Sequence, residues 1–125
     1  MANKILIADD NKEMRETLSR MLAGYEVAEA ADGEAAWAAA VFELPDLILL
    51  DVDMPGMNGI DVLKKTAALP GRPSIIMITG DRSKETAAKA GEIGVCAYLL
   101  KPLDRDEVLE QVRRALAKRE KTRKA

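Results

Sequence analysis

Six residues with reactive or metal-binding side chains follow short apolar runs of this sequence: Asp9, Asp10, Asp51, Asp53, Thr79 and Lys101. Taken singly, each has an ordinary explanation, because an aspartate after a strand often caps a helix and a lysine before proline is usually solvated. If the six residues lie close together in the fold, several carboxylates become neighbours. Two like charges 4 Å apart repel by about 4 kcal/mol at an effective dielectric constant near 20. Such a cluster therefore requires cations.

Lys101 supplies one positive charge, and a hard divalent ion would supply two more. With Asp9, Asp10 and Asp51 ionised, their three negative charges cancel the three positive charges of Lys101 and the ion. The chain has no histidine and a single cysteine, so its ligands are oxygen atoms, which select Mg²⁺, Mn²⁺ or Ca²⁺ over zinc or copper. The small number of carboxylates leaves room for water and a phosphate oxygen, which favours Mg²⁺.

This set of groups could hold a phosphoryl group on a carboxylate. Mg²⁺ and Lys101 would take the phosphoryl oxygens, and Thr79 would donate a hydrogen bond. The chemistry suggested is nucleophilic attack by an aspartate on phosphorus, which gives an aspartyl phosphate. Because the chain has no histidine, it cannot carry a phosphohistidine, and the phosphoryl donor must be another molecule.

Length and composition narrow the remaining possibilities. A chain of 125 residues predicts one domain. The net charge of −2 argues against direct nucleic-acid binding, and no apolar run is long enough for membrane insertion. One cysteine cannot form an intramolecular disulfide, so we expect a cytoplasmic protein.

Five strand-like runs alternate with longer helix-like segments, and the runs are residues 4–8, 25–30, 46–50, 74–78 and 96–99. Several runs are apolar without alternation, which is typical of a parallel sheet covered by helices on both faces. In such sheets ligands bind beyond the carboxyl ends of the strands, where the six residues fall. The helix expected at residues 83–92 has mainly alanines as its apolar residues, so it is either a weakly held element that moves or binds a partner or an ordinary surface helix.

Four motifs in order closely resemble the receiver domain of two-component response regulators. They are Ala8-Asp9-Asp10, the segment from Leu49 to Gly59, Ile78-Thr79-Gly80, and the segment from Gly94 to Lys101-Pro102. The resemblance extends from about Lys4 to Leu116. It implies a single α/β domain, a (βα)5 doubly wound parallel sheet with the flavodoxin-like strand order 2-1-3-4-5, and a cis bond between Lys101 and Pro102.

The resemblance also implies a role for each residue of the acidic cluster. Asp51 would be phosphorylated by a histidine kinase or a histidine phosphotransfer protein. Asp9 and Asp10 would hold Mg²⁺ (or Mn²⁺) together with Asp51 and the backbone carbonyl of Asp53. Lys101 would contact the phosphoryl oxygens.

The remaining implied roles concern signalling. Thr79 and Tyr98 match a switch pair that remodels the face formed by the fourth helix, fifth strand and fifth helix, where a downstream effector protein or an output domain is controlled. Asp53 and Asp81 flank the expected path of the hydrolytic water, so we expect their side chains to modulate dephosphorylation.

Two other interpretations of the function remain open at this point. Asp51-Val52-Asp53 also resembles the nucleophile motif of haloacid dehalogenase-type phosphatases, although the acidic pair here precedes the nucleophile and the chain is short for a cap domain. A flavodoxin-like flavin-binding module would share the architecture, but Asp9 and Asp10 would repel the flavin phosphate.

We expect residues 1–119 to form the receiver domain and residues 120–125 a basic C-terminal tail. No output domain is present in the sequence. The chain is therefore either a stand-alone receiver, which its start at Met1 favours, or one domain of a longer protein.

Overall fold

The computed structural model describes residues 3–124, and helices alternate with strands throughout. The strands are β1 (Lys4–Ala8), β2 (Glu26–Ala30), β3 (Leu47–Asp51), β4 (Ser74–Thr79) and β5 (Ala97–Leu100). The helices are α1 (Lys12–Met21), α2 (Gly33–Glu43), α3 (Gly59–Ala67), α4 (Lys84–Ile93) and α5 (Arg105–Lys124). Across the described residues, no helix combines the length and apolarity needed to cross a membrane.

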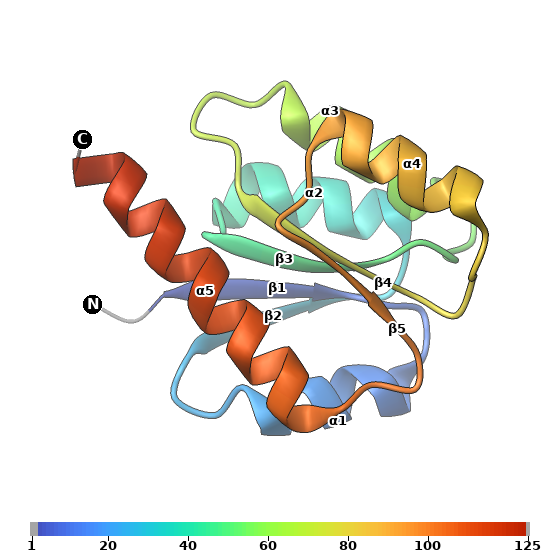
Figure 1. Cartoon of the computed structure of the whole chain (residues 1–125), viewed down its shortest axis with the longest axis horizontal. Coiled ribbons are helices and arrows are strands. Elements are labelled where there is room, and N and C mark those ends of the chain that lie inside the picture. The colour runs from blue at the N-terminus through green and yellow to red at the C-terminus, as the bar shows by residue number, and fades with distance from the viewer. Residues whose placement is uncertain (1–2, 125) are drawn as a thin grey trace.

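The five strands form one parallel sheet in the order β2-β1-β3-β4-β5. Helices cover both of its faces, with α1 and α5 on one side and α2, α3 and α4 on the other (Figure 1). The expected (βα)5 fold and the strand order 2-1-3-4-5 are therefore confirmed. The order reverses at β1 and β3, and the carboxyl ends of these two neighbouring strands carry Asp9 and Asp51.

Alternate residues of the central strands point to opposite helical layers, which explains their unbroken apolar runs. In β3, Leu47 and Leu49 pack with α1 and α5, whereas Ile48 and Leu50 pack with the α2, α3 and α4 layer. All four side chains are at most 1% exposed. Both faces of the sheet thus form rigid cores that hold the strand ends in place.

The expected element boundaries agree with the structure to within one residue. β3 includes Asp51 because this residue pairs with Ile78 of β4, a contact that the apolar pattern alone does not reveal. In α4 the one buried residue among those described is Ala90. Helix α5 continues to Lys124, through residues 120–124 of the segment expected to form a basic tail, and Ala125 lies outside the described residues.

Candidate functional site

The loop after β1 places two aspartates at the edge of the sheet. The Asp9 carboxylate is buried, with 2% of the residue exposed, and accepts a hydrogen bond from the Asn11 backbone N–H at 2.9 Å. Asn11 in turn caps α1, because its side chain accepts from the Met14 N–H at 3.0 Å. Asp10 lies between these two anchored residues and is exposed, so its carboxylate faces solvent beside that of Asp9.

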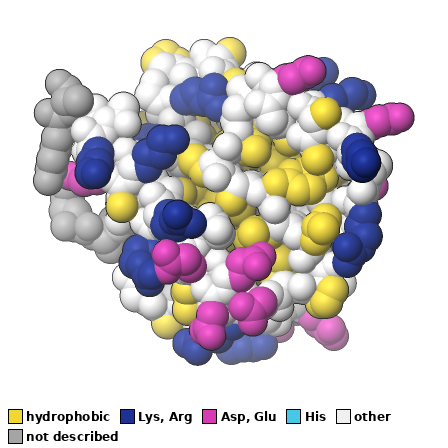
Figure 2. Space-filling model, in the orientation of Figure 1, with side chains coloured by type: hydrophobic (Ala, Val, Ile, Leu, Met, Phe, Trp, Pro, Cys, Tyr) yellow, Lys and Arg dark blue, Asp and Glu magenta, His cyan; other side chains and the backbone are white. Residues whose placement is uncertain are grey.

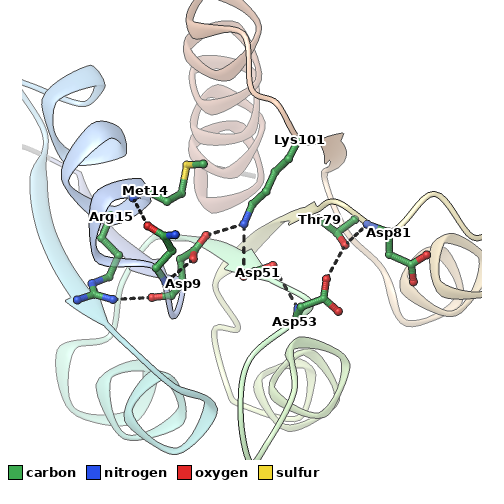
Figure 3. A network of polar contacts seen from close by, with 9 residues as sticks. Asp9, Met14, Arg15, Asp51, Asp53, Thr79, Asp81 and Lys101 are labelled. Carbon is green, nitrogen blue, oxygen red and sulfur yellow. Dashed lines mark hydrogen bonds and ion pairs between the residues drawn. The ribbon is translucent and has the colours of Figure 1, made fainter.

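Arg15 holds the same loop from α1, a role that the sequence analysis missed. Its guanidinium donates to the Asp9 backbone carbonyl at 2.8 Å (Figure 3), and it forms an ion pair with Glu29 of β2 at 3.2 Å. Ser19 also donates to Glu29, at 3.2 Å. One feature of the sequence could have indicated this contact: the expected pairing of β1 with β2 brings Glu29 near the start of α1.

The carboxyl end of β3 presents Asp51. Its carboxylate is buried, with the residue 2% exposed, and accepts from the Asp53 backbone N–H at 3.2 Å. The start of α3 packs directly against this strand end, because the Gly59 N–H donates to the Val52 carbonyl at 2.9 Å. A Cβ atom at Gly59 would lie 2.3 Å from the Asp51 carbonyl oxygen, so this close approach requires glycine.

Strands β4 and β5 supply the hydroxyl and the ammonium. The Thr79 hydroxyl is fully buried, lies 3.5 Å from an Asp53 carboxylate oxygen and accepts from the Asp81 backbone N–H at 2.9 Å. The backbone N–H of Lys101 donates to the Thr79 carbonyl at 2.8 Å, which extends the ladder between the two strands. The bond from Lys101 to Pro102 is cis, as the resemblance implied.

Lys101 reaches between the two buried carboxylates (Figure 3). Its Nζ lies 3.1 Å from Asp9 Oδ2 and 3.5 Å from Asp51 Oδ2. Burial opposes the charge on this lysine, but the hydrogen bond to Asp9 and the charges of Asp51 and Asp9 raise its pKa above the usual value. Lys101 is therefore cationic at neutral pH and partly neutralises the cluster.

The remaining negative charge affects the pKa of Asp51. Burial, followed by the charge of Asp9, raises the pKa of Asp51 from its usual 3.8 to about 6, although Lys101 and the Asp53 N–H act in the opposite direction. One ammonium thus leaves this group of carboxylates under-neutralised, and Asp51 is ionised at neutral pH at a cost in free energy.

The donor set fits a hard divalent cation. Carboxylate oxygens of Asp9, Asp10 and Asp51 all lie within 4.8 Å of one another, and two of these three residues are buried. Oxygen-only donors suit magnesium. The two positive charges of the ion, added to the one of Lys101, would balance the three negative charges of the carboxylates. The structure therefore supports the expected metal site by its geometry and by its charge.

Tyr98 stands apart from this polar network. It pairs with Met77 in the sheet, next to the strand that ends in Thr79. Its hydroxyl is buried and has no hydrogen-bond partner among the described residues. Burial, together with the charges of Asp81 and Asp53, raises the pKa of Tyr98. The hydroxyl is thus held near the site without a fixed partner.

Sequence comparison places the chain among known proteins. The sequence model of the response regulator receiver domain matches residues 5–113. Sporulation initiation phosphotransferase F of Bacillus subtilis is 34% identical over 118 residues, which make up 93% of this chain and 95% of that protein. Two other curated relatives are longer: the match spans 25% of the regulatory protein AtoC of Escherichia coli and 53% of the DNA-binding response regulator MtrA of Mycolicibacterium smegmatis.

Solved structures agree with this assignment. A CheY-like response regulator receiver domain protein of Methanospirillum hungatei is 32% identical with a TM-score of 0.92, and the match covers 98% of this chain and 99% of that one. The CheX–CheY–BeF3–Mg²⁺ complex of Borrelia burgdorferi contains a chain that is 29% identical with a TM-score of 0.82, over 88% of this chain and 86% of that one.

These matches decide between the readings that the sequence left open. The matched region includes all four motifs and spans the parallel sheet from β1 to β5. A haloacid dehalogenase-type phosphatase and a flavin-binding module are therefore excluded as descriptions of this domain, which is a signalling phosphoacceptor and not a classical enzyme. The chain belongs to the response regulator receiver domain family.

Proposed function

We propose that Asp51 is the phosphoacceptor and that it takes its phosphoryl group from a histidine kinase or a histidine phosphotransfer protein. One observation carries this assignment: the buried Asp51 carboxylate lies at a strand end beside a single ammonium and two further carboxylates. Of the three carboxylates, that of Asp51 lies at the end of β3, the central strand of the sheet, and accepts a hydrogen bond from the Asp53 N–H.

The transfer step follows from these contacts. A carboxylate oxygen of Asp51 attacks phosphorus and forms a new P–O bond, while the P–N bond of the donor phosphohistidine breaks and its electron pair leaves with the imidazole. Lys101, 3.5 Å from Asp51 Oδ2, is placed to bond the phosphoryl oxygens. The Thr79 hydroxyl donates a long hydrogen bond, 3.5 Å, to Asp53. It could exchange this weak bond for one to a phosphoryl oxygen.

Asp9, Asp10, Asp51 and the backbone carbonyl of Asp53 would hold Mg²⁺, or Mn²⁺ in its place. When bound, the ion supplies positive charge that screens the carboxylates from the incoming phosphoryl group. The CheX–CheY–BeF3–Mg²⁺ complex of Borrelia burgdorferi contains magnesium, which supports the proposal of Mg²⁺ for this chain.

We further propose that phosphorylation is read at the face formed by α4, β5 and α5. Movement of Thr79 toward the phosphoryl group would change the packing beside Tyr98, whose buried hydroxyl has no partner among the described residues. Weak burial of α4, where Ala90 is the buried residue, lets this helix respond. A downstream effector protein or an output domain would bind the altered face. We propose that the protein is cytoplasmic and that it neither binds nucleic acid directly nor inserts into a membrane.

Asp53 and Asp81 are proposed to set the lifetime of the phosphoryl group. Both lie beside Thr79, and both line one cavity between α3 and α4. Their acidic side chains would change the local charge and the orientation of the attacking water. Neutral variants Asp53→Asn and Asp81→Asn should change the dephosphorylation rate, and an unchanged rate in both would contradict the assignment. We also propose that residues 1–119 form the receiver domain and residues 120–125 a basic C-terminal tail, which continues α5 as far as Lys124.

The test is phosphorylation of the purified chain by acetyl phosphate, with Mg²⁺ or with EDTA, followed by intact-mass measurement. We expect one phosphoryl adduct that requires Mg²⁺ and is absent in Asp51→Asn. The control Asp106→Asn alters an exposed aspartate in the first turn of α5 and should leave labelling unchanged. Labelling that persists in Asp51→Asn would show that another residue is the acceptor.

A further inference from the structure

A second cavity lies at the opposite end of the sheet from the carboxylate cluster. Its volume is about 560 Å³, and it is lined by the loop before β4, the loop before β5 and the C-terminal half of α5. Ser74, the first residue of β4, and Cys96, just before β5, mark its position at the amino ends of these strands. The functional site described above has no residue in common with it.

The walls of this cavity are held in place by Arg119. Its guanidinium donates to the backbone carbonyl of Arg72 at 2.7 Å and to that of Gly71 at 3.3 Å, and its Nε lies 3.7 Å from Asp46. Arg72 then donates to the Gly94 carbonyl at 2.9 Å, which joins the two loops across the cavity. Three separate segments are thus fixed relative to one another without a ligand.

The lining combines cationic heads with apolar walls. Arg72, Lys118 and Arg119 contribute positive charge, and no acidic side chain is present among the described residues that line the cavity. Arg119 forms an ion pair with Asp46, but Lys118 and Arg72 form none with the side chains that the structure describes. Leu69, Ile75 and Val95 contribute apolar surface.

Figure 2 shows how this charge is distributed. Several Lys and Arg side chains lie over α5 at the left of the view, others lie along the right edge, and most acidic side chains lie in the lower part. The chain carries a net charge of −2, so this concentration of basic groups is a local feature. It would attract anions to this end of the molecule.

We propose that this cavity binds a small organic anion with a carboxylate or phosphate head and an apolar body. Its volume falls in the range of about 300–1,000 Å³ that is usual for small-molecule sites, which are mostly apolar with a few polar groups. Arg72 keeps donors that no described residue uses, and guanidinium groups bind carboxylate and phosphate heads through paired hydrogen bonds. The apolar body would lie against Leu69, Ile75 and Val95. This site does not depend on Asp51 or on its phosphorylation.

The proposal is tested by titrating the full chain with butanoate, hexanoate, octanoate and hexyl phosphate at constant ionic strength. Two-dimensional amide NMR gives both the dissociation constant and the location of binding. We expect the largest shifts at Gly71, Val95 and Cys96 and at Ala115 of α5. Affinity should rise by up to about fourfold for each methylene group that enters the cavity. Comparison of hexanoate with hexyl phosphate distinguishes the two head groups.

Charge specificity is tested with the double variant Arg72→Gln/Lys118→Gln. Both residues are exposed, and the amide spectrum of the variant reports whether it remains folded. Its affinity for octanoate should fall by about fivefold or more, as expected when two charge contacts are lost. The matched control Arg114→Gln/Lys121→Gln removes the same charge from exposed positions of α5 that do not line the cavity, and it should bind octanoate as the native chain does.

Three outcomes would overturn the proposal. The first is no saturable shift at the cavity residues with any of the four probes. The second is an equal loss of affinity in the control variant, which would mean non-specific attraction to a basic helix. The third is binding of hexanamide as tight as that of hexanoate, since the cavity would then be merely apolar.

Discussion

Replacement of Asp51 by asparagine should stabilise the metal-free protein at neutral pH. The pKa of Asp51 is raised from 3.8 to about 6 by burial and by the charge of Asp9, so ionisation of this group opposes folding. Because one pKa unit corresponds to about 1.4 kcal/mol, the opposition amounts to about 2 to 3 kcal/mol. Asparagine removes the charge but keeps an oxygen that can accept from the Asp53 N–H.

The pH dependence gives the sign of the effect. Below pH 3.8, Asp51 is protonated in both the folded and the unfolded state, and the native chain and Asp51→Asn should differ little. Between pH 3.8 and about 6, the unfolded state releases its proton first, so the native chain loses stability as pH rises. Above pH 6 the full advantage of Asp51→Asn should be present.

Urea unfolding in EDTA, followed by circular dichroism at about pH 3.5 and about pH 7.5, measures this difference. As a control, Glu92→Gln removes an exposed carboxylate of α4 and should change the free energy of unfolding by less than about 0.5 kcal/mol. Addition of Mg²⁺ should stabilise the native chain more than Asp51→Asn and so narrow the gap at pH 7.5. Destabilisation by Asp51→Asn at pH 7.5, or an advantage that is equal at both pH values, would refute the reasoning.

Three further substitutions test other contacts of the site. Arg15→Ala removes the bond to the Asp9 carbonyl and should weaken Mg²⁺ binding by about tenfold or more in calorimetric titration; an unchanged affinity would show that the loop holds itself. Gly59→Ala places a Cβ 2.3 Å from the Asp51 carbonyl oxygen and should lower the free energy of unfolding by about 1–3 kcal/mol in urea, whereas native stability would contradict the close packing. Lys101→Met leaves two buried carboxylates without their ammonium and should cost about 1–3 kcal/mol at pH 7.5 without metal; a loss of the same size at pH 3.5, where Asp51 is protonated, would point to packing instead of charge.

The apolar pattern predicted a parallel sheet covered by helices and the composition of the acidic cluster, and the family resemblance implied the strand order. Unbroken apolar runs such as residues 47–50 occur when both faces of a strand are buried, and the structure shows this for every residue of β3. Parallel strands put their carboxyl ends at one edge of a sheet, so the sequence was enough to group Asp9, Asp51, Thr79 and Lys101.

The supporting contacts could not be read from the sequence. Arg15 and Glu29 are 14 residues apart, and their ion pair depends on the packing of α1 beside β2. The need for glycine at position 59 arises from a backbone approach to Asp51, which no local pattern encodes. The basic cavity is assembled from two loops and α5, so its existence depends on how distant segments pack.

The sequence by itself determined which groups are present, how the strands and helices alternate, and why the carboxylates need cations, because these follow from residue type and periodicity. Tertiary structure decided how strongly the groups interact. Burial and distance set the raised pKa of Asp51 and the placement of Lys101 between two carboxylates. Electrostatic energies depend on separation and on solvent exposure, and both quantities exist only once the chain is folded.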